Sequence, residues 1–139
     1  MSRPVTKLVV HYSATPEGRE HDVRDIDRWH RERGWRMVGY HYVITLDGTV
    51  QVGRPEHMPG AHAKGHNTDS IGICFIGGTD AKGRSKNTLT AAQEEALLNL
   101  LHNLKRRYPA AEVIGHRDLS GAATECPGFN VSEWWASHQ

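Results

Sequence analysis

One short apolar run limits the folds that are open to this chain. Residues Ser70 to Ile76 read Ser-Ile-Gly-Ile-Cys-Phe-Ile and offer almost no polar side chain that could face water. Such a run is typical of a strand that is buried on both faces, so the chain must supply a covering layer on each side of its sheet. Cys74 lies inside the run, and we interpret it as a small, inert core residue rather than a ligand.

Two amphipathic segments can supply these layers. Residues Asp22 to Arg33 are predicted to form a helix, with Asp22 as its N-terminal cap. A longer helix begins at Thr90, where Gln93 is placed for a capping box, and it ends before Pro109. In both segments apolar residues recur at intervals of three and four, so each helix is expected to bury one face.

The remaining periodic segments predict strands and one short helix. Lys7 to His11 is a short β-branched strand, and a hairpin is predicted where Tyr40–Leu46 and Thr49–Val52 flank Asp47-Gly48. Asn130 begins a short C-terminal helix as part of a second capping box. Strands therefore alternate with helices and one hairpin is antiparallel. The sequence predicts an α/β (α+β) fold, with a central mixed β-sheet flanked by helices in a single domain of residues 1–139.

Charge and apolar content exclude several classes of function. The chain has 17 basic and 16 acidic residues among 139, so it lacks the basic footprint of a nucleic-acid-binding protein. No apolar run reaches the length of a membrane span, and the N-terminus lacks the apolar core of a signal peptide. We expect a monomer that binds no nucleic acid, does not insert into membranes and is made in the cytoplasm. Ten histidines and two cysteines favour metal or proton chemistry over a disulfide framework.

The segment Val113 to Phe129 carries the residues best suited to a metal. A short apolar strand leads to His116, an irregular loop follows, and Cys126 stands before a Pro-Gly turn. Imidazole and thiolate are good zinc ligands, and catalytic zinc has three protein ligands with one open position. His11, at the end of the first strand, is our candidate for the third ligand. Considered alone it would be interpreted as a histidine at the rim of the core.

Two loops and one partial match to a kinase motif are further features that bear on function. The loop Gly53–Asn67 is rich in glycine, proline and histidine, and its length favours a functional role. The loop Gly77–Lys86 is polar and has no glycine pattern that would hold phosphate. His116-Arg-Asp-Leu119 matches part of the catalytic loop of protein kinases, but Ala123 stands where that loop has a metal-binding asparagine. No glycine-rich ATP loop is present either, so a kinase is excluded.

The sequence resembles the zinc-dependent N-acetylmuramoyl-L-alanine amidases, and among them the short amidase endolysins of T-odd coliphages. This family is related to the peptidoglycan recognition proteins. The resemblance covers nearly the whole chain in nine blocks that follow the family's order: His11-Tyr-Ser-Ala-Thr15, Trp29-His30, Gly39-Tyr40-His41, Asp47-Gly-Thr-Val50, Gly53-Arg54, His62-Ala-Lys-Gly-His-Asn67, Ser70-Ile-Gly-Ile-Cys74, His116-Arg-Asp118 and Cys126-Pro-Gly128.

The resemblance implies an enzyme that hydrolyses the amide between N-acetylmuramic acid and L-alanine in peptidoglycan, with Zn²⁺ as cofactor. The family's zinc ligands fall on His11, His116 and Cys126, and its catalytic tyrosine falls on Tyr40. Thr124 stands two residues before the ligand cysteine, where the phage enzymes carry a catalytic lysine and related recognition-type amidases tolerate threonine. We expect Tyr40 and Thr124 to assist catalysis.

Further implications concern the substrate groove and where the enzyme acts. The resemblance places His62 and Asn67 in the wall of the substrate groove. Asp118 is a candidate partner that orients an imidazole, and a salt bridge with Arg117 is its alternative role. An endolysin would reach the cell wall after release, either with a holin or by lysis. Two other functions stay open: a peptidoglycan-binding module without catalysis, and a cytoplasmic amidase that recycles soluble muropeptides.

Overall fold

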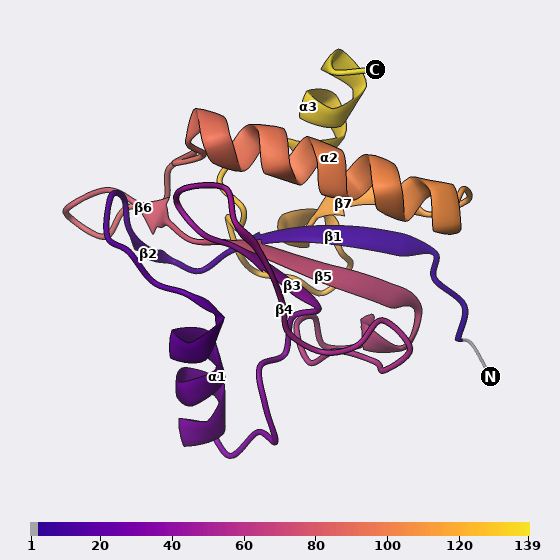
Figure 1. Cartoon of the computed structure of the whole chain (residues 1–139), viewed down its shortest axis with the longest axis horizontal. Coiled ribbons are helices and arrows are strands. Elements are labelled where there is room, and N and C mark those ends of the chain that lie inside the picture. Colours follow the sequence, from indigo (N-terminus) through magenta and orange to yellow (C-terminus); the bar gives the residue numbers. More distant parts are fainter. Residues whose placement is uncertain (1–2) are drawn as a thin grey trace.

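A five-stranded sheet with the order β4-β3-β5-β1-β7 organises residues 3–139, the part of the chain that the computed structural model describes (Figure 1). β1 runs parallel to β5 and β7, β3 runs parallel to β5, and β4 pairs antiparallel with β3. The predicted mixed sheet and the α+β class are therefore confirmed. The strands are β1 (Lys7–Tyr12), β2 (Thr15–Pro16), β3 (Tyr42–Ile44), β4 (Val50–Val52), β5 (Ser70–Phe75), β6 (Gly78–Thr79) and β7 (Glu112–Gly115).

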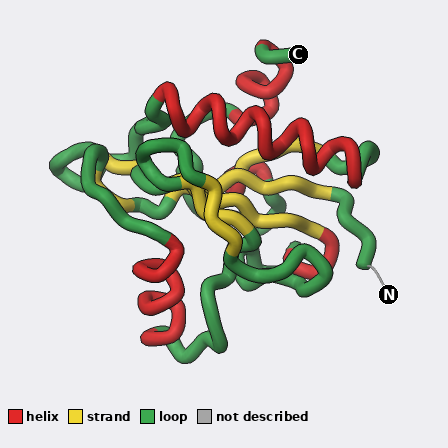
Figure 2. Tube along the Cα trace, viewed as in Figure 1, coloured by secondary structure: helices red, strands yellow, loops and turns green. Residues whose placement is uncertain are grey.

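Helices cover both faces of this sheet. They are α1 (Val23–Glu32), α2 (Ala91–Arg107) and α3 (Val131–Ser137), with short 3-10 helices η1 (Asn67–Asp69) and η2 (His116–Asp118). α2 and α3 lie on one side of the sheet and α1 on the other (Figure 1, Figure 2). All six residues of β5 are buried, as predicted, because this strand lies between β1 and β3 under both layers.

Side chains alternate along each strand, so one face of the sheet packs in an apolar core and the opposite face carries candidate functional residues. Leu8 and Val10 of β1 pack in the core cluster that contains the α2 leucines. Side chains alternate between faces of a strand, so Val9 and His11 point to the opposite side. His11 pairs in register with Cys74, which packs with Ile26 of α1 in a second apolar cluster. Cys74 is fully buried, as predicted for a core residue.

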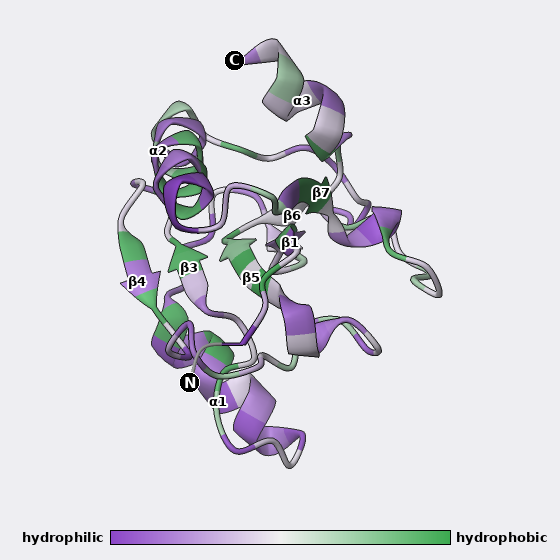
Figure 3. Cartoon of the chain, turned by 90° about the vertical axis from the view of Figure 1, so that its right-hand side faces the viewer, coloured by the Kyte–Doolittle hydropathy of each residue, from purple (hydrophilic) through white to green (hydrophobic). Residues whose placement is uncertain are grey.

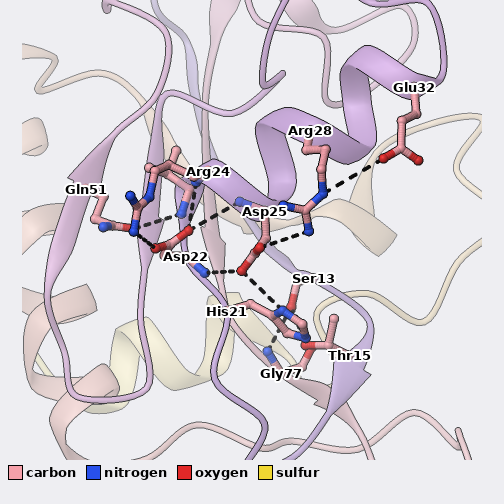
Figure 4. Close-up of polar contacts among 11 residues, drawn as sticks. Ser13, Thr15, His21, Asp22, Arg24, Asp25, Arg28, Glu32, Gln51 and Gly77 are labelled. Carbon is pink, nitrogen blue, oxygen red and sulfur yellow. Dashed lines mark hydrogen bonds and ion pairs between the residues drawn. The ribbon is translucent and has the colours of Figure 1, made fainter.

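Polar side chains fix the start of α1 against the hairpin. Asp22 caps the helix, and its own N–H donates to the Asp25 carboxylate, which completes a capping box (Figure 4). Asp25 also pairs with Arg28 one turn later. The Gln51 side chain of β4 accepts the Val23 N–H at 2.8 Å. This contact joins the first turn of α1 to the edge strand of the sheet.

Three details depart from the local sequence signals. β3 begins at Tyr42 instead of Tyr40. The segment predicted as an entirely polar loop, residues 77–86, contains β6, which pairs in parallel with β2. These two-residue strands exist because the chain brings them together, and neither has a strong local signal. Asn130 caps α3 by accepting the Glu133 N–H, but the return bond from the Glu133 side chain is not formed in the described residues.

Hydropathy follows this architecture. Figure 3 shows hydrophobic residues concentrated in strands such as β3 and β5 and hydrophilic residues along much of α1. The buried leucines of α2 face the sheet and form the largest apolar cluster with it. Within residues 3–139, none of the helices combines the length and apolar character needed to cross a bilayer.

Candidate metal centre

Three side chains from distant parts of the chain meet on the α1 side of the sheet. His11 lies on β1, His116 directly follows β7, and Cys126 lies in the loop beyond it. β1 and β7 are parallel neighbours with Val10 opposite Gly115, so His11 and His116 leave the sheet side by side. One ligand atom from each of the three residues lies within 4.8 Å of the other two. The structure therefore brings together all three predicted ligands.

The spacing and chemistry of this set fit zinc. Zinc bonds of about 2.0–2.3 Å in a tetrahedron place neighbouring ligand atoms about 3.3–3.7 Å apart, so small side-chain rotations would close the set. Burial lowers the pKa of His11 and of His116, which keeps both imidazoles in the neutral form that binds metals. Burial also raises the pKa of the Cys126 thiol to about 12, while the hydrogen bond from Tyr12 acts in the opposite direction.

Contacts around the cluster tie the ligand loop to the sheet. The Cys126 sulfur accepts the Tyr12 N–H at 3.2 Å, which ties the ligand loop to the end of β1. The rings of His11 and His116 lie 4.5 Å apart between centroids. Asp118 accepts the Gly115 N–H at 2.9 Å and caps η2. That bond differs from both roles considered for Asp118, the imidazole partner and the salt bridge with Arg117.

Two open pockets meet at the cluster. One, of about 230 Å³, is lined by all three ligands, by Tyr40 and Thr124, and on the α1 side by residues that include Trp29 and Arg33. The other, of about 220 Å³, shares His116 and Thr124 with the first. A larger pocket of about 350 Å³ lies at the start of α1 beside the hairpin and contains none of the ligands. Trp29 packs in the α1 cluster and also faces the first of these pockets.

Tyr40 lies beside the ligands at the pocket wall. Its ring centroid is 5.0 Å from that of His11. Burial raises the pKa of the Tyr40 hydroxyl well above its ordinary value, and the nearby Cys74 and Cys126 thiols act in the same direction. The hydroxyl therefore keeps its proton at neutral pH and can serve as a hydrogen-bond donor. His30 is buried and accepts the N–H of Gly39, the residue directly before Tyr40.

Thr124 also lines both pockets, and its oxygen shapes the ligand loop. The hydroxyl oxygen accepts the Cys126 N–H at 3.1 Å. A serine or threonine hydroxyl has one proton and two lone pairs, so the Thr124 proton stays available to a group in the pocket. The catalytic role of Thr124, which the resemblance implies, stays a prediction.

His62 lies on the interior side of the cluster, and Asn67 supports the loop that carries it. His62 is 9% exposed, and its Nδ1 lies 2.8 Å from Nε2 of His11. Asn67 accepts the N–H groups of His62 and Ala63 with its side-chain oxygen, which shapes the loop. The resemblance implied a place in the groove wall for both residues. In the described part of the chain, neither residue lines the pockets beside the ligands. The His62 ring nitrogens face His11 and Ser70 instead.

Ser70 is a site residue that the sequence did not indicate. Its hydroxyl lies 3.0 Å from Nε2 of His62, and the residue is fully buried at the start of β5. The only available signal was a hydroxyl at the head of an otherwise apolar strand. Burial also lowers the pKa of His62 to about 3, with neighbouring histidines and arginines acting in the same direction.

A sheet between helices, with three candidate metal ligands beside two open pockets, has the layout expected of a catalytic metal centre rather than an enclosed structural one. Comparison with known proteins gives the family. The chain belongs to the N-acetylmuramoyl-L-alanine amidase family, whose sequence profile matches residues 1–129. The family that the nine sequence blocks predicted is therefore confirmed.

Similar proteins include phage endolysins and solved amidase structures. The endolysin of Klebsiella phage KP32 is 42% identical over 134 residues, which covers 96% of this chain and 87% of that protein. The endolysin of Escherichia phage T7 is 42% identical over 95% of this chain and 86% of its own length. The N-acetylmuramoyl-L-alanine amidase LysC from Clostridium intestinale superimposes with a TM-score of 0.82 at 31% identity, covering 99% and 85% of the two chains. Drosophila PGRP-LB superimposes with a TM-score of 0.80 at 28% identity, covering 99% and 82%.

Proposed function

We propose that this protein is a zinc-dependent N-acetylmuramoyl-L-alanine amidase of the endolysin type. It hydrolyses the amide between N-acetylmuramic acid and L-alanine in bacterial peptidoglycan. The observation that carries the proposal is the set of His11, His116 and Cys126, whose ligand atoms lie within 4.8 Å of one another in the wall of an open pocket. Membership of the amidase family and the phage endolysins among its relatives support the same substrate.

The metal ligands and the residues beside them have different roles in catalysis. His11, His116 and Cys126 hold zinc, which when bound supplies Lewis-acid chemistry that polarises a carbonyl and makes water nucleophilic at neutral pH. Tyr40, kept protonated by burial, donates a hydrogen bond to the carbonyl oxygen as it gains negative charge. Thr124 offers its hydroxyl proton from the other side of the shared pocket wall. It thereby replaces part of the function that a lysine has at this position in phage enzymes.

The enzyme acts on the cell wall after it leaves the cytoplasm in which it is made. Its similarity to phage endolysins supports release with a holin or by lysis. A recycling amidase would instead cleave soluble muropeptides, and a binding module would cleave neither substrate. Intact peptidoglycan sacculi and soluble fragments, compared as substrates, separate these functions by the mass of the products.

The test replaces one ligand and leaves the fold in place. Cys126→Ala removes the thiolate, and two imidazoles are too few for a stable catalytic site. We expect this variant to lose bound zinc and the release of stem peptides while it still binds peptidoglycan. Cys74→Ala is the matched control, because Cys74 is equally buried but is not part of the ligand set.

Each outcome separates the candidate functions. Unchanged cleavage by Cys126→Ala would contradict the zinc mechanism. If the parent protein binds peptidoglycan but releases no product even with added zinc, the binding module is correct. Loss of cleavage in both cysteine variants would indicate a general effect on folding, which thermal unfolding of the two proteins measures directly.

A further inference from the structure

A chain of buried hydrogen bonds extends from His11 away from the pocket. His11 Nε2 lies 2.8 Å from His62 Nδ1, and His62 Nε2 lies 3.0 Å from the Ser70 hydroxyl oxygen. The Ser70 hydroxyl in turn donates to the backbone carbonyl of His66 at 2.7 Å. These hydrogen bonds are shielded from water, because the exposed fraction is 1% for His11, 9% for His62 and 0% for Ser70.

The carbonyl at the far end sets the direction of every bond in this chain. A carbonyl oxygen can only accept, so the single proton of the Ser70 hydroxyl goes to His66 O. The Ser70 oxygen must then accept from His62, which places the proton of His62 on Nε2. A neutral imidazole carries one proton, so His62 Nδ1 is an acceptor and receives the proton on His11 Nε2.

His62 is neutral in this environment. Its ring contacts His11 and Ser70 by hydrogen bonds, and no carboxylate contacts it among the described residues. A buried imidazolium without a negative partner is strongly disfavoured, because burial removes the water that would solvate the charge. The donor and acceptor roles derived from the His66 carbonyl therefore hold for both His11 and His62.

We propose that His62 and Ser70 are positioning residues that hold His11 in its Nε2–H tautomer and so present its bare Nδ1 to zinc. The proposal rests on the zinc site of the proposed function. Metal-bound histidines commonly donate their second N–H to an oxygen acceptor, which orients the ring and makes the ligand more basic. Here the acceptor is another imidazole, and the backbone oxygen that fixes the pattern stands two side chains away.

The fold keeps this second imidazole in place from three directions. The Asn67 side chain accepts the backbone N–H of His62. Gly72 lies directly beneath the ring, where a Cβ atom would come within 2.6 Å of His62 Cγ and Cδ2. The His41 ring lies 6.1 Å from that of His62 and accepts the Gly72 N–H, which fixes the strand backbone below. These contacts leave His62 one position, the one that meets His11.

The first experiment determines the tautomers in the metal-free protein by ¹⁵N NMR of the histidine side chains. We expect His11 and His62 both to carry their proton on Nε2. A proton on Nδ1 of His11 would overturn the proposal. This measurement needs neither substrate nor zinc, so its result is independent of whether the protein proves to be an amidase.

The second experiment measures zinc affinity by competition with a chelating dye. His62→Asn keeps an oxygen near the place of Nδ1, whereas His62→Leu keeps volume without an acceptor. We expect the leucine variant to bind zinc about 10–100-fold more weakly and the asparagine variant to recover most of that loss. His57→Asn is the control, because His57 is exposed on the same loop.

The outcomes are separable. Zinc affinity of His62→Leu equal to that of the parent overturns the proposal, and so does equal weakening in the asparagine and leucine variants. If His62→Leu does not fold, Ser70→Ala is measured in its place. That variant removes the acceptor for His62 Nε2–H, and we expect ¹⁵N NMR to show a mixture of His11 tautomers; an unchanged tautomer overturns the proposal. A parent protein that binds no zinc would contradict the proposed function itself.

Discussion

Replacing Gly72 by alanine is expected to disturb the metal centre without altering any of its ligands. Gly72 lies in the middle of β5, between β1 and β3, and pairs with Val9 of β1. An added Cβ would come within 2.6 Å of two His62 ring carbons, far closer than real Cβ atoms approach. Neighbouring strands hold the backbone on both sides, so the His62 ring has to move, and the bond to His11 Nε2 is lost.

The size of the effect follows from two opposing contributions. Forcing an extra methyl group into a packed site lowers stability by about 1–3 kcal/mol. Glycine inside a strand is itself about 0.5–1 kcal/mol less favourable than alanine, which offsets part of the loss. We therefore expect the free energy of unfolding of Gly72→Ala to fall by about 1–2 kcal/mol. In a His62→Ala background the clash is absent, so the same substitution should become neutral or stabilising by about 0.5–1 kcal/mol.

The assay is a double-mutant cycle measured by urea unfolding of the metal-free parent, both single variants and the double variant. Residues in direct contact couple by about 0.5–3 kcal/mol, whereas independent residues add. A change of sign between the two backgrounds would establish that Gly72 acts through His62. Additive effects, with coupling below about 0.5 kcal/mol, would refute the packing argument. Zinc competition on Gly72→Ala should show the same weakened binding as His62→Leu.

Two further predictions concern the pocket and the loop that carries His62. Tyr40→Phe should retain zinc and slow turnover by roughly a hundredfold, as loss of one oxyanion donor does; unchanged turnover would reduce Tyr40 to a packing role. Glu56→Gln should lower the free energy of unfolding by about 1–3 kcal/mol, because the Glu56 carboxylate accepts from Tyr42, Tyr108 and Arg107. Burial acts to raise the pKa of Glu56, but these three hydrogen bonds outweigh it and the pKa is lowered. Its stabilisation is therefore present above the unfolded pKa of about 4.3 and is lost as the pH falls through the folded value. The glutamine variant should lose this acid sensitivity, and equal acid unfolding profiles would contradict the assignment.

Local sequence signals determined most of the secondary structure. Asp22 caps α1 as predicted, and Thr90 caps α2 in the capping box that its spacing from Gln93 predicts. These signals act within a single helical turn, so a neighbouring stretch of sequence contains all the groups involved. The continuous apolar run of β5 likewise required two covering layers. The short strands β2 and β6 were missed because only their pairing across the fold makes them strands.

The ligand set could also be predicted from the sequence, through residue chemistry and the resemblance to the amidases. His11, His116 and Cys126 are residue types that zinc selects. His11 and His116 stand at the ends of neighbouring strands, and Cys126 lies in the loop that follows. His62 stood in the same motif blocks, but no local sequence signal places it beneath His11 instead of in the groove. Its partner in the fold is 51 positions away along the chain.

The tertiary structure alone decided which ring nitrogen of each buried histidine in the site carries the proton. Whether a histidine contacts metal through Nδ1 or Nε2 depends on what meets its other nitrogen. For His11 that is settled by His62, then Ser70 and the His66 carbonyl, three groups that a loop and the start of β5 bring behind one strand end. Sequence determines which side chains can bind zinc. Only the packed fold determines where their protons lie, because each proton is placed by an acceptor from a distant segment.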